Sequence, residues 1–147
     1  ETGKTLEWEG RKLGIQICYE IIFPELAREQ VRNGACLLIA ITNDAWYGKT
    51  AGPYQHFSLA VLRAVENRRV LARSANTGIS GFIDPVGRML DLTPLMEEAA
   101  VVREVPLLDT LTFYTRFGDI FAGACLVVSA AAVIWAQIGL RRRRTPC

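Results

Sequence analysis

The sequence predicts a layered α/β or α+β domain followed by one transmembrane helix. Two observations indicate the domain: apolar runs too short for helices alternate with amphipathic helical patterns, and turn signals rich in Gly, Pro and Asn separate them. A third observation indicates the membrane helix. Half of the residues are hydrophobic, but the excess lies mainly in about the last thirty residues.

The first elements are expected to be a strand, a helix and a second strand. Residues 12–18 (KLGIQIC) alternate weakly and are rich in β-branched residues, which predicts a strand ending at Cys18. A helix is predicted from Pro24 to just before Gly34, because proline favours the first helical position. Residues 36–42 (CLLIAIT) form a nearly continuous apolar run, typical of a strand covered on both faces.

The later elements follow a loop rich in glycine at residues 45–54. Apolar positions at Leu59, Leu62 and Val65 with polar residues between them predict a helix over residues 55–69. Turn signals then separate several short strands. The expected strands cover residues 70–75, 79–84, 88–92 and 101–105.

The membrane helix is predicted over residues 120–140, which carry no charge. At about 1.5 Å per residue it is about 30 Å long and matches the bilayer core, whereas buried helices of soluble proteins rarely run so long without a charge. Trp135 suits the headgroup level near one end, and the block from Arg141 to Arg144 predicts a cytoplasmic tail. The preceding domain is then expected on the opposite side of the membrane.

These boundaries predict four parts: a domain at residues 1–110, an interfacial linker at 111–119, the membrane helix at 120–140 and a basic tail at 141–147. An ordinary linker with an aromatic belt accounts for residues 111–119 equally well. The chain begins at Glu1 without an initiator Met, so we expect it to be the carboxy-terminal part of a longer protein.

Charge and cysteine content argue against several classes of protein. The formal net charge is only +2, and four positive charges lie in the tail, so a nucleic-acid partner is not expected. The four cysteines show no C-x-x-C pair and no metal-ligand spacing, which argues against a zinc site or a disulfide framework.

Cys18 is the candidate nucleophile. It lies at the predicted end of a strand just before a helix, where the side chain is held rigidly and the helix dipole favours a thiolate. The alternative is a packing role, since free cysteines are often buried. Glu20 is a carboxylate in an otherwise apolar region, so it either makes a specific bond or is a solvated turn residue.

A second polar cluster follows the strand predicted at residues 36–42. Asn43, Asp44 and Trp46 lie at this strand end, where active-site loops often occur, although turn chemistry alone also accounts for the first two. His56 is the single histidine, and we interpret it as a structural hydrogen-bonding residue and not as the base of a Cys-His pair.

The chain resembles the apolipoprotein N-acyltransferases, a membrane branch of the nitrilase-like carbon-nitrogen hydrolases, in two segments, ICYEIIFPELARE (17–29) and TNDAWYGKTAGPYQHFSLAVLRAVENRRVLARSANTGISGFIDPVGRM (42–89). The resemblance covers most of residues 10–92, and the terminal membrane helix fits the family's layout. It implies an αββα nitrilase-like sandwich, of which this chain would form the carboxy-terminal part.

The resemblance also implies roles for individual residues. The family's catalytic set is a Glu, a Lys and a Cys, and the Cys falls on Cys18 in a C-Y-E motif. Tyr19 and Glu20 of this motif are expected to support the site. The N-D-x-W motif falls on Asn43, Asp44 and Trp46, and Trp46 is expected to line the acyl or substrate pocket.

This chain departs from the family's pattern in two ways. Tyr47 stands where Phe is usual. The family's Glu and Lys are expected upstream of Glu1, because Lys4 and Lys12 stand too near Cys18 to be that Lys. The fragment alone is therefore expected to be inactive.

The resemblance implies an acyltransferase of lipoprotein maturation in the bacterial inner membrane. A fatty acyl chain passes from a phospholipid, through a Cys thioester, to the α-amine of the diacylglyceryl cysteine of an apolipoprotein, without a metal or cofactor. The catalytic domain is expected on the periplasmic face. A membrane-tethered nitrilase-like amidase and a non-catalytic membrane-anchored binding domain are the alternatives.

Overall fold

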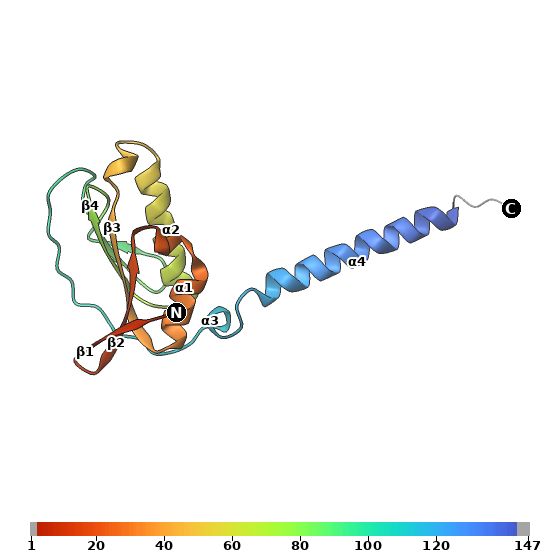
Figure 1. Ribbon diagram of the computed structural model, residues 1–147, viewed down its shortest axis with the longest axis horizontal. Helices are drawn as coiled ribbons and strands as arrows, with labels where there is room; N and C mark the ends of the chain where they lie inside the picture. The colour runs from red at the N-terminus through yellow and green to blue at the C-terminus, as the bar shows by residue number, and fades with distance from the viewer. Residues whose placement is uncertain (1–2, 144–147) are drawn as a thin grey trace. The chain divides into compact units, whose positions relative to one another are not determined.

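The computed structural model describes the backbone of residues 3–143 and the side chains of residues 3–137. Two compact units make up the chain, Glu1–Arg116 and Phe117–Cys147. The first is a mixed α/β domain, and the second contains one long apolar helix (Figure 1). The predicted fold class is confirmed.

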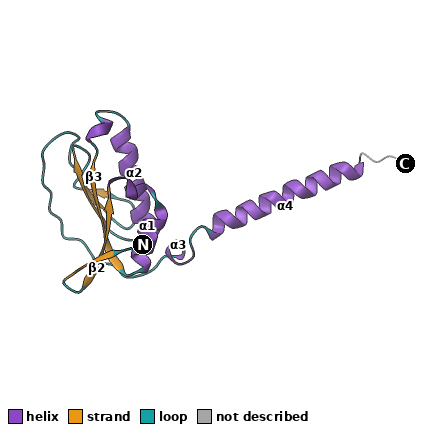
Figure 2. Ribbon diagram, viewed as in Figure 1, coloured by secondary structure: helices purple, strands orange, loops and turns teal. Residues whose placement is uncertain are grey.

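A six-stranded sheet forms one layer of the first unit (Figures 1 and 2). Its strands lie side by side in sequence order, with β2, β3 and β4 parallel and the remaining pairs antiparallel. The strands are β1 (Thr5–Trp8), β2 (Arg11–Ile17), β3 (Ala35–Asn43), β4 (Leu71–Asn76), β5 (Gly81–Ile83) and β6 (Met89–Leu90).

Two strand predictions differ from the structure. Strand β1 was not predicted; it pairs with β2 through a two-residue turn at Glu9 and Gly10, both with positive φ. The strand predicted at residues 101–105 is wrong, because this segment runs without strand pairing. Its Arg103 side chain instead binds the carboxylate of Asp91.

Helices α1 (Pro24–Arg32) and α2 (Gly52–Asn67) cover one face of the sheet (Figure 2). Both begin with a proline in the first turn, where the missing N–H removes no hydrogen bond. This explains why α2 begins at Gly52, inside the predicted loop. The helix ends where Arg68 adopts the left-handed conformation.

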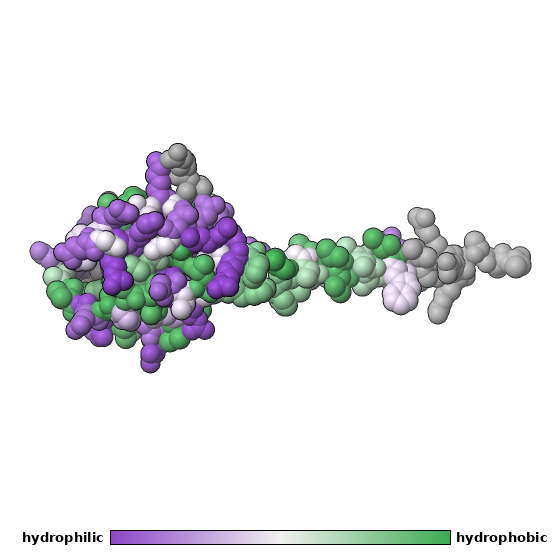
Figure 3. Space-filling view, turned by 90° about the horizontal axis from the view of Figure 1, so that it is seen from below, coloured by the Kyte–Doolittle hydropathy of each residue, from purple (hydrophilic) through white to green (hydrophobic). Residues whose placement is uncertain are grey.

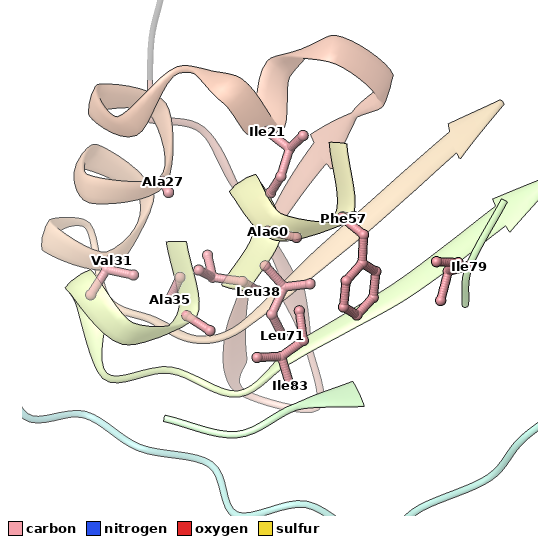
Figure 4. Packing of buried hydrophobic residues seen from close by; sticks show 12 residues of the cluster. Ile21, Ala27, Val31, Ala35, Leu38, Phe57, Ala60, Leu71, Ile79 and Ile83 are labelled. Atoms are coloured by element: carbon pink, nitrogen blue, oxygen red, sulfur yellow. The ribbon is translucent and has the colours of Figure 1, made fainter. Parts of the chain in front are cut away.

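The hydrophobic core lies between this helix layer and the sheet (Figure 4). Leu38 of β3, Leu71 of β4 and Ile83 of β5 project from the sheet, and all three are completely buried. Val31 of α1 and Phe57 of α2 pack from the helix side. Alternate residues of the central strands therefore face the helices.

The opposite face of the sheet is only partly covered by the described residues. Ile17 and Ile41 on this face are 53% and 46% exposed. The strand at residues 36–42 was predicted to be covered on both faces. Within the part of the chain that the structure describes, this prediction is wrong, because one face stays partly exposed. Parallel strands are ordinarily buried on both faces, as they would be in the expected αββα sandwich.

The second unit contains α4 (Ile120–Arg143), preceded by the short helix α3 (Phe113–Phe117) at the junction. Residues 120–137 of α4 have a mean hydropathy of 2.0, and none of this stretch is buried. Figure 3 shows hydrophobic residues along the described part of this helix. By length and composition it is sufficient to cross a bilayer. The basic tail predicted at residues 141–147 lies outside the described side chains.

The core predicts different effects for two identical substitutions. Leu71→Ala removes a completely buried side chain and should lower the free energy of unfolding by about 2–5 kcal/mol. Leu62→Ala on α2, where the side chain is 48% exposed, should change it by less than about 1 kcal/mol. Thermal unfolding of the detergent-solubilised protein measures both. Equal shifts in melting temperature would contradict the assigned core.

Candidate active site

Cys18 lies at the carboxyl end of β2, where it opens the 3-10 turn η1 (Cys18–Ile22). Its φ is +53°, in the left-handed region that residues other than glycine rarely adopt. Such backbone conformations concentrate at functional sites, where the surrounding structure holds them in place. The thiol is free and half-buried, so the sharp turn presents it at the end of a rigid strand.

Glu20 holds this turn through its carboxylate. Its Oε2 accepts a hydrogen bond of 2.7 Å from the backbone N–H of Ile17, the residue before Cys18. The Glu20 carbonyl also accepts from the N–H of Phe23 at 3.1 Å. Glu20 is exposed but makes a specific bond, and it therefore fixes the backbone on both sides of the thiol.

Asp44 is the centre of a buried charged cluster next to this turn. Its carboxylate accepts from Arg73 Nη2 at 2.8 Å and from Thr42 Oγ1 at 3.0 Å, and His56 Nδ1 lies 3.0 Å away. Asp44, His56 and Arg73 are all less than 5% exposed. The three side chains come from the end of β3, from α2 and from β4, so the cluster joins three elements.

Charge pairing compensates for the burial of Arg73. Burial lowers the pKa of its guanidinium, and the neighbouring Asp44 carboxylate raises it again. A guanidinium stays protonated in proteins, so the cluster keeps one buried positive charge against the carboxylate. Removal of either partner would leave the other as an unpaired buried charge.

Aromatic rings connect this cluster to the residues around Cys18. The His56 ring lies 6.4 Å from the Tyr19 ring and 5.8 Å from the Tyr47 ring, measured between centroids. Burial, followed by the charge of Asp44, raises the pKa of Tyr47, which keeps its hydroxyl protonated. Gly52 leaves room for this ring, since a Cβ there would lie 2.5 Å from Tyr47 Cδ1.

Asn43 and Trp46 occupy the loop that follows β3. The Asn43 Oδ1 accepts from the N–H of Ala45 at 3.1 Å, which is the turn chemistry expected of this residue type, and from Asn76 Nδ2 at 3.4 Å. Trp46 is 71% exposed and packs on Tyr47, with centroids 4.9 Å apart. The side chain of Trp46 is therefore available to a ligand.

The predicted site residues all lie at the carboxyl ends of β2 and β3, which are parallel neighbours. Ligand sites in α/β sheets commonly form at this edge. Sequence reasoning missed Arg73 and the link between His56 and Asp44. The available signal was an arginine within a short predicted strand, where a buried charge requires a partner.

The buried ion pair predicts a large loss of stability on Asp44→Asn. This substitution removes the countercharge of Arg73 and should lower the free energy of unfolding by about 3–5 kcal/mol. Asp91→Asn makes the same change in the exposed pair with Arg103 and should lower it by less than about 1 kcal/mol. Thermal unfolding compares the two variants, and a similar effect of both would contradict the role assigned to Asp44.

Comparisons with known proteins identify the family of this chain. The family model of the carbon-nitrogen hydrolases matches residues 2–112. The apolipoprotein N-acyltransferase of Geobacter metallireducens is 52% identical over 90% of this chain, which covers 25% of that protein. The apolipoprotein N-acyltransferase of Chlorobaculum tepidum is 42% identical over 85% of this chain, which covers 24% of that protein. The chain thus spans about a quarter of the length of these relatives.

Solved structures show the same fold. The NitN amidase from Nesterenkonia sp. AN1 superposes with a TM-score of 0.63 and 28% identity, over 80% of this chain and 46% of that chain. A mutant of this amidase, with an acetamide moiety covalently added at its active-site cysteine, gives a TM-score of 0.54 and 30% identity over 65% of this chain and 38% of that chain. From the matched model, the relatives and the shared fold, the chain belongs to the carbon-nitrogen hydrolase family and is a homologue of part of the apolipoprotein N-acyltransferases.

Proposed function

We propose that this chain carries the nucleophilic cysteine of an apolipoprotein N-acyltransferase of the bacterial inner membrane. One observation carries the proposal: the half-buried Cys18 thiol stands on a positive-φ turn at the carboxyl end of β2, braced by Glu20. High identity to N-acyltransferases and an apolar helix of membrane-spanning length support it.

The proposed reaction proceeds in two balanced steps. In the first, the Cys18 thiolate attacks the ester carbonyl of a phospholipid, a C–S bond forms, the C–O bond to glycerol breaks, and the lysophospholipid oxygen takes a proton. In the second, the α-amine of an apolipoprotein's diacylglyceryl cysteine attacks the thioester. The N–C bond forms, the C–S bond breaks, and the amine's proton leaves as the thiolate is regenerated.

The remaining site residues would act by positioning. Glu20 would hold the turn that presents Cys18, and Tyr19 would pack on the buried cluster beside it. Asn43 would hold the loop after β3 at the surface through its bond from the N–H of Ala45. Asp44 would hold the same loop from the interior through its ion pair with Arg73. The exposed ring of Trp46 would then contact the acyl chain or the lipid-linked acceptor.

The general base and the oxyanion donor would come from a Glu and a Lys in a part of the longer protein that precedes this chain. A carboxylate base removes the thiol proton, and a lysine ammonium stabilises the negative charge that develops on the carbonyl oxygen. No metal or cofactor is required.

The catalytic domain would face the periplasm, with residues 111–119 at the headgroups and the carboxy terminus in the cytoplasm.

A membrane-tethered amidase is the second candidate, favoured by the structural similarity to the Nesterenkonia amidase. The same Cys18 would form a thioester but would pass it to water. The two functions differ in the fate of the acyl group. With a diacylglyceryl peptide present, the acyltransferase yields an N-acyl amide, whereas the amidase yields a free carboxylic acid.

Cys18→Ala in the full-length protein should abolish lipoprotein N-acylation and leave membrane insertion intact, because the thioester cannot form. Cys125→Ala, which removes an exposed thiol from α4, is the matched control and should retain activity. The mass of the acceptor peptide measures both outcomes. Retained N-acylation in the Cys18→Ala protein would remove this residue from its proposed role.

The isolated 147-residue chain should show no acyl transfer above the uncatalysed rate. The physical reason is the expected absence of the base and the oxyanion donor, each worth on the order of 100-fold in rate. Release of lysophospholipid from vesicles measures this activity. A turnover comparable to that of the full-length protein would place both groups within this chain.

A further inference from the structure

The guanidinium of Arg28 on α1 donates hydrogen bonds to backbone carbonyls of the short helix α3, more than 80 residues later in the sequence. Its Nε donates to the carbonyls of Tyr114 and Thr115 at 3.2 and 3.1 Å, and its Nη2 donates to the carbonyl of Arg116 at 3.3 Å. The last carbonyls of a helix lack partners within the helix and carry partial negative charge. A planar cation with several donors is suited to bind them.

A second set of contacts holds the same segment from α2. The hydroxyl of Thr112 donates to the carbonyl of Glu66 at 2.7 Å, and the hydroxyl of Thr115 donates to Asn67 Oδ1 at 3.0 Å. Thr115 and Asn67 are completely buried. Asn67 is itself fixed by donating from Nδ2 to the carbonyl of Arg63 at 3.0 Å. The chain is thus bound to both α1 and α2 up to Arg116.

The apolar helix begins very soon after this fixed point. Only Phe117, Gly118 and Asp119 separate Arg116 from Ile120, the first residue of α4. At about 3.6 Å per residue, four steps of chain span at most about 14 Å. While the contacts on residues 112–116 hold, the free tether between Arg116 and α4 is limited to this length.

We propose that Arg28 and Asn67 are positioning residues that hold residues 112–116 on the domain, so that only residues 117–119 form the free tether to α4 and the Cys18 thiol stays concentrated near the bilayer surface. This inference rests on the proposed function. The acyl ester of a phospholipid lies near the headgroup level and does not leave the bilayer to reach the enzyme. A longer or looser tether lowers the effective concentration of the thiol at that surface.

The test compares two acyl donors in the full-length protein, reconstituted in vesicles of phosphatidylethanolamine and phosphatidylglycerol. The first donor is the vesicle phospholipid, and the second is the water-soluble ester p-nitrophenyl butyrate. Mass spectrometry follows the rate of acylation of Cys18. Arg28→Ala should lower the rate with phospholipid about 10- to 100-fold, as misplacement of reactants does, and change the rate with the soluble ester by less than about twofold.

Two further variants complete the experiment. Ten Gly and Ser residues inserted between Gly118 and Asp119 should give the same selective loss without removing any contact of the domain. Arg32→Ala removes an exposed arginine one turn later on α1 and should react like the unaltered protein with both donors.

The outcomes separate this inference from the proposed function. An equal loss with both donors in Arg28→Ala, or no loss with phospholipid in the insertion variant, overturns the positioning role alone. Absence of any phospholipid-derived acyl group on Cys18 in the unaltered protein overturns the proposed function, and the inference with it. If Arg28→Ala does not fold, the insertion variant decides, because its domain is unchanged.

Discussion

The buried ion pair between Asp44 and Arg73 fixes the geometry on which the site depends. It joins the end of β3 to β4, and through His56 it also joins α2. An unpaired guanidinium in this interior would be strongly unfavourable, so the loop after β3 has little freedom to move. Tyr19 and Tyr47 both pack near the His56 ring. The buried His56 therefore positions both the residue after Cys18 and the loop that follows β3.

Two features of the sheet complete the site. Parallel pairing of β2 with β3 brings Cys18 and the N-D-x-W segment to the same edge, although they are 25 or more residues apart in the sequence. The face of the sheet that carries Ile17 and Ile41 is partly open in the described chain. An αββα sandwich places a second sheet against such a face, in keeping with the quarter-length coverage of the acyltransferase relatives.

The sequence predicted the parts of the fold that local patterns determine. The apolar runs that became β2 and β3, the proline at the start of α1, and the uncharged stretch of α4 all carry their signal within a few residues. The strand β1 was missed because it has only four residues and most of them are exposed, so it shows no pattern of a buried strand. Residues 101–105 were assigned wrongly because extended apolar residues need a pairing partner to form a strand.

The site was predictable only in part, for a physical reason. Cys18, Glu20 and the N-D-x-W residues form two short motifs, and a motif can be found from sequence alone. The partners of Asp44 cannot be found in this way, because His56 and Arg73 lie 12 and 29 residues away in the sequence. They meet Asp44 only through packing and strand register. The same holds for Arg28, whose partners on α3 are more than 80 residues distant.

The central claim is that the Cys18 thiol accepts a fatty acyl chain directly from a phospholipid. Full-length protein incubated with palmitoyl phospholipid in vesicles, acid-quenched without an acceptor and digested, allows the acylated residue to be located by tandem mass spectrometry. We expect a palmitoyl group in thioester linkage on the peptide that contains Cys18, and we expect neutral hydroxylamine to release it. A Cys18 peptide that stays unmodified while lysophospholipid accumulates would contradict it.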